Sequence, residues 1–202
     1  MTAPGSSPFR FRAYDGDAGV DQFDDVRTLY ADVYAEPPYC EGPDDVKEFA
    51  QGWPHRVSRP GFRLVVARVG SESAGFIFGH QLPADTRRWE NALEPLPAEL
   101  TAEWPGRTFL IVELAVRRKF RRRGLGRALH AAVLRERPEE RVTLLVRPEP
   151  EAAPAQRLYE ALGYTSVGPM RPFSGAPLYE CLLMTLPPAT TDPQGATRLF
   201  LA

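Results

Sequence analysis

The sequence is poor in cysteine and has no long apolar run. Its two cysteines, Cys40 and Cys181, form no CxxC pair and stand at no metal-ligand spacing from any of the three histidines. No apolar run approaches the roughly 20 residues of a membrane span, and the N-terminus MTAPGSSPFRFR lacks the apolar core of a signal peptide. These absences predict a cytoplasmic protein with no metal and no membrane partner.

The sequence also lacks a large net charge. Its 202 residues carry a formal charge of −1 and are 43% hydrophobic, which is enough for one domain with a substantial core. Prolines gather in loops and beyond residue 186. We predict a single domain over 1–186, with its core at about 62–186, and a flexible tail at 187–202. A homodimer is left open.

Apolar periodicity predicts a chain that mixes helices and strands, and no internal repeat is visible. The predicted helices are 21–34, 44–51, 125 to about 137, and 155–163, the third ended by Pro138. The predicted strands are 9–14, 62–68, 74–81, 109–116, 142–146, 164–167 and 178–186. These strands complete a mixed sheet with helices on its faces, interrupted by a long connection at 83–106.

The most informative segment, residues 113–128, reads ELAVRRKFRRRGLGRA. An apolar strand runs into a basic turn and then into an amphipathic helix. Gly124 and Gly126 let the backbone bend close to a ligand, while the first N–H groups of the helix remain unpaired. Arginine side chains and the helix dipole add attraction for an anion, so this turn predicts a polyphosphate site. Neither the P-loop pattern nor the GxGxxG dinucleotide fingerprint fits it.

The spacing of Arg121, Gly124 and Gly126 after a strand resembles motif A of the GNAT superfamily of N-acetyltransferases, written R/Q-x-x-G-x-G/A. Residues 155–164 read AQRLYEALGY and resemble the family's motif B, A-x-x-L-Y-x-x-L-G-[FY]. The second motif follows the first at the distance that the family's topology requires. The resemblance covers about 62–186. It implies an α/β (α+β) fold with a mixed, mainly antiparallel sheet of about six or seven strands flanked by helices.

The resemblance also implies acetyl-coenzyme A as co-substrate and assigns residues to it. Backbone groups of the strand end are expected to pair with the pantetheine arm, namely Leu114, Ala115 and Val116. The loop is expected to hold the pyrophosphate through Arg121, Arg122, Arg123, Gly124, Leu125, Gly126 and Arg127. One departure stands out, because Ala152 occupies the place of an asparagine that many relatives carry six residues before the motif B leucine.

Two side chains are candidates for the chemistry. Glu113 is the one charged residue in the apolar run 109–116, and a carboxylate in a buried strand is costly unless it faces water, a cation or a site. We expect it to act as the base that deprotonates the acceptor amine, the alternative being an ion pair with a nearby arginine. The resemblance implies that Tyr159 is the acid that protonates the departing thiolate, the alternative being simple packing against the sheet.

The acceptor is harder to predict. Residues 1–52 hold 11 acidic and 4 basic side chains, and the interruption 83–106 adds further acids and two tryptophans. These surfaces favour a small cationic amine, aminoglycoside-like or polyamine-like, that attacks the thioester directly. A peptide amine is the first alternative, and a non-catalytic acyl-coenzyme A sensor is the second. Nucleic acid is not expected, because the basic patch is confined to one turn.

Overall fold

The structure is a computed structural model that describes residues 7–187. The strands are β1 Arg10–Asp15, β2 Arg63–Val69, β3 Glu72–Gln81, β4 Thr108–Val116, β5 Arg141–Val146, β6 Thr165–Met170 and β7 Tyr179–Thr185. The α-helices are α1 Phe23–Tyr34, α2 Pro43–Val57, α3 Ala98–Thr101, α4 Leu125–Val133 and α5 Ala153–Glu160. Except for Pro187, the predicted tail lies outside the described residues. Among residues 7–187, no helix has the length and hydropathy of a segment that crosses a bilayer.

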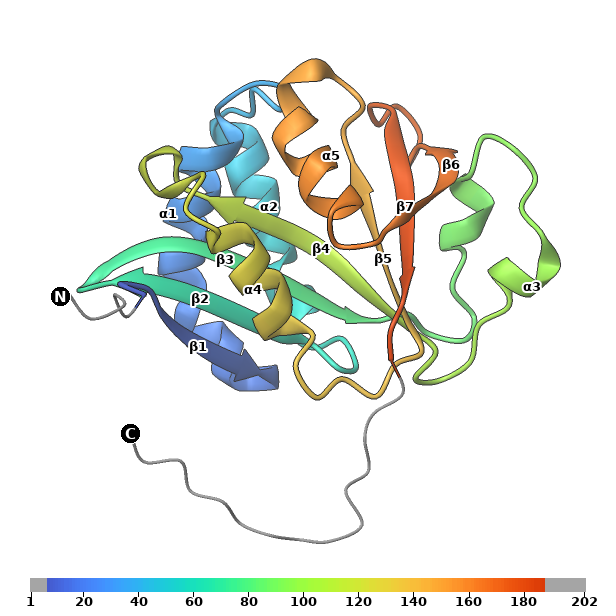
Figure 1. Ribbon diagram of the computed structural model, residues 1–202, viewed down its shortest axis with the longest axis horizontal. Coiled ribbons are helices and arrows are strands. Elements are labelled where there is room, and N and C mark those ends of the chain that lie inside the picture. The colour runs from blue at the N-terminus through green and yellow to red at the C-terminus, as the bar shows by residue number, and fades with distance from the viewer. Residues whose placement is uncertain (1–6, 188–202) are drawn as a thin grey trace, which may run out of the picture.

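The seven strands form one sheet in the order β1-β2-β3-β4-β5-β7-β6. Every neighbouring pair is antiparallel except β4 and β5, which are parallel. Helices α1 and α2 cover one face, and α4 and α5 cover the other (Figure 1). The prediction of a mixed, mainly antiparallel sheet flanked by helices is therefore confirmed.

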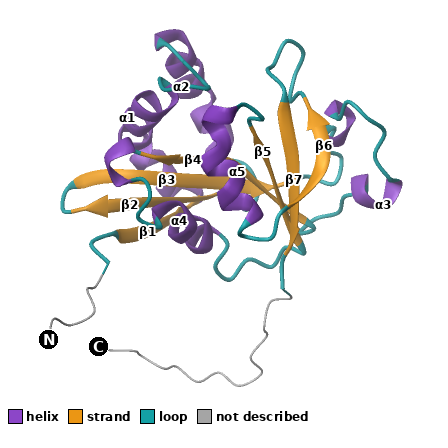
Figure 2. Cartoon of the chain, turned by 45° about the horizontal axis from the view of Figure 1, so that its top comes forward, coloured by secondary structure: helices purple, strands orange, loops and turns teal. Residues whose placement is uncertain are grey.

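The sheet opens in its middle, between β4 and β5. Their ladder covers only Thr108–Leu110 against Arg141–Thr143. Figure 2 shows β5, β7 and β6 running at a steep angle to β2 and β3. Beyond Leu110, the edge of β4 that faces β5 pairs with no strand of the described chain. An open strand edge offers unpaired backbone groups to an extended ligand.

A β-bulge lies in the open part of β4. Phe78 of β3 pairs with Glu113 and Gly79 pairs with Ile111, which leaves Val112 as the extra residue. After the bulge, the side chain of Ala115 packs in the core under α1 and α2. Leu114 packs against the core under α4 and α5. The bulge therefore sets which face each side chain of the β4 end meets.

Two apolar cores hold the helices to the sheet. Under α1 and α2, the indole of Trp53 meets the ring of Phe78 edge-on, with ring centroids 5.3 Å apart. Under α4, the side chains of Leu125, Leu129 and Val133 are buried, as the sequence predicts. Full burial of each such side chain contributes about 1.5–3 kcal/mol to the free energy of folding. These cores fix the two helix layers on either side of the open edge.

Two predicted helix ends differ from the structure. Helix α2 runs to Val57 rather than to residue 51, because Phe49, Trp53 and Val57 form a buried stripe that carries the helix past Pro54. Helix α4 ends at Val133, before the predicted stop at Pro138. In α2 the buried stripe decides the boundary more strongly than local propensity, whereas after α4 the residue Glu136 adopts φ 56°, a left-handed conformation that does not continue the helix.

Candidate active site

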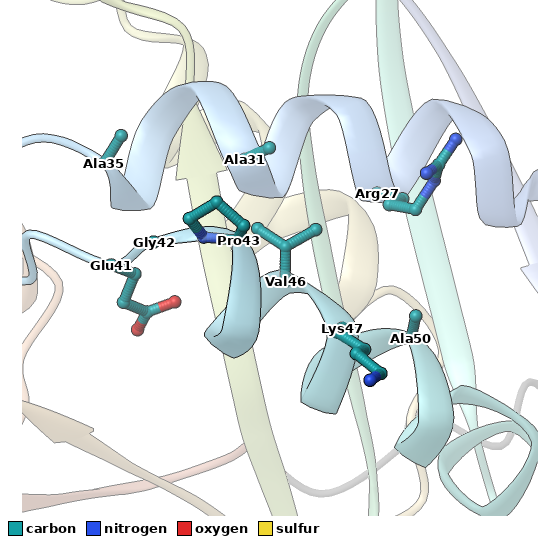
Figure 3. A pocket seen from close by; sticks show the side chains of 9 residues that line it. All are labelled: Arg27, Ala31, Ala35, Glu41, Gly42, Pro43, Val46, Lys47 and Ala50. Atoms are coloured by element: carbon teal, nitrogen blue, oxygen red, sulfur yellow. The ribbon is translucent and has the colours of Figure 1, made fainter.

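Two concave regions are candidates for a site. The first is an open groove between α1 and α2, with Ala31 and Ala35 facing Pro43 and Val46, and with Arg27 and Glu41 at its ends (Figure 3). Apart from those ends and Lys47, its lining is apolar or glycine. The second is a cavity of about 320 Å³ at the opening between β4 and β5. The second combines several ionisable side chains and is the stronger candidate.

The second cavity brings together both predicted catalytic side chains. Glu113 comes from β4 and Tyr159 from α5, and both line it. The remaining walls include backbone and side chains of both diverging strands, three further tyrosines and two more charged residues, namely residues 110–112, 114, 144–146, Tyr34, Tyr39, Glu41, Arg88, Ala155, Pro172, Phe173 and Tyr179. The opening in the sheet thus forms a pocket lined by apolar, aromatic and charged side chains.

The carboxylate of Glu113 is held by one hydrogen bond, which the hydroxyl of Tyr34 donates to Oε2. Burial raises the pKa of Glu113 to about 7, the bond from Tyr34 lowers it, and the negative charge of Glu41 raises it further. Within residues 7–187, no arginine or lysine forms an ion pair with Glu113. The alternative of a structural ion pair therefore finds no partner in the described chain.

Tyr159 is buried and also packs in the core beneath α5. Its ring meets Tyr164 edge-on at a centroid distance of 5.4 Å. Burial raises the pKa of Tyr159, and the negative charge of Glu113 adds to that rise. Its side chain lines the cavity that also contains Glu113. Packing and exposure to the cavity thus occur together at this residue.

Several residues of the cavity escaped the sequence analysis. Tyr34 closes α1, and Tyr39 and Glu41 follow in the connection to α2. The rings of Tyr34 and Tyr39 meet edge-on, 4.7 Å apart between centroids. A signal was present, because three of the seven tyrosines fall within residues 30–39. Tyr179 and Arg88, from β7 and from the interruption 83–106, had no such local signal.

The loop before α4 has the conformation expected of an anion site. Gly124 adopts φ 76° at the N-cap of α4, a left-handed conformation that favours glycine. The N–H groups of residues 122–127 donate to no protein acceptor in the described chain. Arg122 and Arg123 are exposed, whereas the side chain of Leu125 is buried. The loop therefore offers backbone donors flanked by two free arginine side chains.

Arg121 and Arg127 are placed differently from their neighbours. Arg121 donates from Nε to the carbonyl of Val116 at 2.8 Å, and its Nη1 lies 2.7 Å from Oε2 of Glu36. Arg127 is exposed and donates from Nη2 to the carbonyl of Ala161 at 3.3 Å. The side chain of Arg121 thus anchors the loop to β4 and to the turn after α1.

The predicted pantetheine residues lie on the open part of β4. On one side, Leu114, Ala115 and Val116 pair with β3. On the other side they face the opening, although the carbonyl of Val116 already accepts the bond from Arg121. Strand geometry thus presents backbone groups of the predicted residues where an extended chain can lie beside them.

Ala152 is buried at the start of α5 and brings no polar group to the loop after β5. Gln156 binds that loop instead. Its Nε2 donates to the carbonyls of Arg147 at 2.8 Å and Glu149 at 3.3 Å. The loop is therefore held from the helix, without a side-chain amide at residue 152.

Part of the predicted acidic surface is engaged in ion pairs. Five acids from the first 52 residues pair with arginines, namely Asp15, Asp24, Asp25, Asp32 and Glu36. In the interruption, Glu103 pairs with Arg141 at 2.7 Å and Glu90 pairs with Arg87. The carboxylates that line the cavity are Glu41 and Glu113.

Comparisons with known proteins bear on the family and the fold. Residues 23–164 match the model of the acetyltransferase (GNAT) family, whereas no curated protein matches the chain. One similar structure is a putative GNAT acetyltransferase from Desulfovibrio desulfuricans, at 19% identity, covering 88% of this chain and 98% of that one, with a TM-score of 0.61.

Two others have named acceptors. The ribosomal-protein-S18-alanine N-acetyltransferase from Escherichia coli is 17% identical, and the match covers 96% of this chain and 99% of that one with a TM-score of 0.56. An aminoglycoside 6'-acetyltransferase type Ii is 18% identical, and the match covers 88% of this chain and 98% of that one with a TM-score of 0.59. At these identities the structures show the fold, and the family match spans well over half of the chain. The chain therefore belongs to the GNAT family of N-acetyltransferases, enzymes that use acetyl-coenzyme A.

Proposed function

We propose that this protein transfers an acetyl group from acetyl-coenzyme A to the primary amine of a small cationic molecule by direct attack. One observation carries the proposal. Glu113 and Tyr159 come from β4 and α5 and line one cavity at the opening of the sheet. A base and an acid on one cavity are what amide formation from a thioester requires.

The loop before α4 is suited to the pyrophosphate of the donor. The unpaired N–H groups of residues 122–127 and the dipole of α4 attract an anion, and Arg122 and Arg123 are free to bind its oxygens. The open edge of β4 at Leu114 and Ala115 supplies backbone groups for the amides of the pantetheine arm. Arg121 supports the loop through its bonds to Val116 and Glu36.

Glu113 is suited to prepare the acceptor. A primary amine has a pKa of about 10.4 in water and arrives as an ammonium ion. Because the pKa of Glu113 is about 7, its ionised form is well populated at neutral pH and binds protons more strongly than an ordinary carboxylate. Glu113 accepts one proton from the ammonium ion, and the nitrogen becomes a nucleophile.

Tyr159 completes the proton balance. The nitrogen forms a bond to the thioester carbon, the carbon–sulfur bond breaks, and the sulfur leaves with the bonding electron pair. Tyr159 gives its phenolic proton to that sulfur and regains a proton from the nitrogen, directly or through water. The proton that Glu113 took from the ammonium ion is then released to solvent, which restores the ionised carboxylate. Because burial raises the pKa of Tyr159, the phenol returns to its protonated form readily.

The acceptor proposal rests on the size and charge of the cavity. A volume of about 320 Å³ suits a small molecule, and Glu41 and Glu113 attract its ammonium group. A similar structure is an aminoglycoside acetyltransferase, whereas another acts on a ribosomal-protein alanine. The small cavity favours the first class, and a peptide amine is the alternative.

A coupled assay of thiol release tests the proposal. Purified protein is mixed with acetyl-coenzyme A and a panel of primary amines, and the products are identified by mass spectrometry. We expect turnover with small amines and an acetyl amide as product. Binding of acetyl-coenzyme A without turnover of any amine or peptide would favour the sensor and contradict the proposal.

A further inference from the structure

Arg88 is a half-buried cation that forms no ion pair with any described residue. It begins the short 3-10 helix Arg88–Asn91 in the interruption between β3 and β4, and it lines the cavity that contains Glu113. Its Nε and Nη2 atoms are shielded from solvent and have no hydrogen-bond partner in the described chain. The thiol of Cys181 lies beside the guanidinium, and Glu103 acts on it only through its field.

The segment that carries Arg88 is fixed in place. The indole of the next residue, Trp89, is buried and donates to Glu103 at 3.0 Å. Asn91 donates from Nδ2 to the carbonyl of Pro172 at 3.2 Å, and Ala92 forms a β-bridge with Met170 at the end of β6. This anchoring keeps Arg88 at the cavity rather than in solvent.

Such a position is energetically costly without a ligand. Shielding guanidinium nitrogens from water without a carboxylate or carbonyl partner is unfavourable. The same burial lowers the pKa of Arg88. The buried arginines Arg137 and Arg141 each form an ion pair with a carboxylate of the protein, Glu139 and Glu103 respectively. Arg88 differs in that the cavity is the place from which an anion can reach it.

The cavity also has an acidic part that comes from another region of the fold. Glu41 lies in the connection between α1 and α2, whereas Arg88 lies in the interruption between β3 and β4, with its guanidinium beside Cys181 of β7. The Oε2 atom of Glu41 is also buried without a hydrogen-bond partner among residues 7–187. With Glu113, the cavity lining therefore contains two carboxylates, from β4 and from the connection between α1 and α2, and one guanidinium from the interruption.

We infer that the acceptor carries a carboxylate as well as its primary amine, and that Arg88 binds this carboxylate while Glu113 and Glu41 receive the amine. The acceptor class is then amino-acid-like, and Arg88 determines its specificity. This inference rests on the proposed function and refines it, because the ammonium group still provides the positive charge. A bidentate guanidinium–carboxylate contact is directional and strong in a dry pocket.

The test compares amines that differ only in the carboxylate. Each of a series of α- and ω-amino acids is measured beside the carboxamide of the same skeleton, together with diamines as polycationic competitors. With acetyl-coenzyme A as donor, we expect kcat/KM of the wild-type protein to favour the carboxylates by about 10- to 100-fold. A ratio near one in the wild-type protein would overturn the inference, whatever the variants do.

Variants then assign the preference to Arg88. We expect Arg88→Gln to bring the ratio to within about twofold and Arg88→Lys to retain part of it, because lysine keeps the charge without the fork. Arg87→Gln is the matched control, since the neighbouring Arg87 is exposed and pairs with Glu90, and it retains the full ratio. An unchanged ratio in a folded Arg88→Gln protein would contradict the inference.

A carboxylate can also arrive on the acyl group of the donor. Succinyl-coenzyme A is therefore tested with uncharged-tail amines such as butylamine. A wild-type preference for succinyl over acetyl transfer that Arg88→Gln abolishes would place the carboxylate on the donor and overturn the assignment to the acceptor. Failure of every amine to accept an acetyl group would instead reject the proposed function itself, so the two failures are distinguishable.

Discussion

The hydroxyl of Tyr34, the last residue of α1, donates a hydrogen bond to Glu113, the one acidic residue of β4. Burial and the negative charge of Glu113 both raise the pKa of Tyr34, so the phenol keeps its proton and acts as the donor. The bond favours the ionised carboxylate and opposes the effect of burial on Glu113. The contact joins the layer of α1 and α2 to β4.

The first prediction concerns the pH profile of kcat/KM. In the wild-type protein we expect a slope of about one below pH 7 and a plateau above it, because the ionised form of Glu113, whose pKa is about 7, is required. Glu113→Gln removes the base, so the rate falls by about 100-fold near pH 7 and then depends on the free amine alone. It keeps rising toward the pKa of the amine, about 10.4.

Glu160→Gln is the control for this profile, because Glu160 is exposed at the end of α5, outside the cavity. Its profile is expected to match that of the wild-type protein. If Glu113→Gln preserves the inflection near pH 7, another group is the base.

The second prediction concerns Tyr34→Phe. Loss of the donated hydrogen bond disfavours the ionised form of Glu113, so the acid limb of the profile moves to higher pH. The rate of the variant at pH 7 falls several-fold, whereas at higher pH the variant nearly reaches the plateau of the wild-type protein. The measurement is kcat/KM from pH 5.5 to about 9, a window that brackets the pKa of Glu113 at about 7. Tyr14→Phe, whose hydroxyl contacts Arg68 on the outer strands, should leave the limb in place.

The third prediction separates catalysis from binding at Tyr159. Tyr159→Phe removes the acid but keeps the ring that packs on Tyr164, so kcat falls by about 10- to 100-fold while the Kd for acetyl-coenzyme A changes little. Steady-state kinetics and calorimetry measure the two quantities. Tyr164→Phe is the control, because its hydroxyl meets Nε2 of His130 at 2.8 Å in the core and its loss lowers Tm rather than kcat. Equal kcat for Tyr159→Phe and wild type would reject the acid role.

The fourth prediction concerns the free arginines of the loop before α4. The double change of Arg122→Gln and Arg123→Gln is expected to weaken binding of acetyl-coenzyme A by about tenfold or more, and less strongly at high salt. The KM for S-acetyl-pantetheine, which lacks the pyrophosphate, should not change. Arg118→Gln removes an exposed charge at the start of the same turn and is the control for nonspecific field effects. Equal weakening toward both donors would place the pyrophosphate elsewhere.

The fifth prediction concerns the support beneath Arg88. Glu103 lies 2.7 Å from Arg141 and accepts bonds from Trp89 at 3.0 Å and Thr108 at 2.8 Å. Glu103→Ala leaves a buried arginine unpaired, which costs about 3–5 kcal/mol and lowers Tm by roughly 10 °C. Since Trp89 adjoins Arg88, the KM for the acceptor should rise more than that for acetyl-coenzyme A. Glu90→Ala breaks an exposed pair and is expected to change Tm little.

The local parts of this site were predictable from sequence. The strand, basic turn and helix at 108–133 lie together in the chain, and apolar pattern, glycine spacing and charge each point to the same structure. Glu113 was also recognisable, because a charged residue stood alone in an apolar strand.

The parts that depend on distant contacts were not predictable. Tyr34 and Glu113 are 79 positions apart, and Arg121 meets Glu36 across 85 positions, so no short window contains either pair. A count of charges likewise could not show which acids are paired. Asp25 and Asp32 pair with Arg68 and Arg117, far along the chain, and the residue that the interruption contributes to the cavity lining is Arg88.

The extra residue at Val112 sets the phase of the side chains along β4. Side chains of a regular strand alternate, so removal of Val112 would put the residues before it out of step with the residues after it. Either the carboxylate of Glu113 would turn away from Tyr34, or the strand residues 108–111 would exchange their two faces. The frame of β4 thus couples hydrophobic packing to the position of the Glu113 carboxylate beside Tyr34, and a single-residue deletion at this position would disturb both.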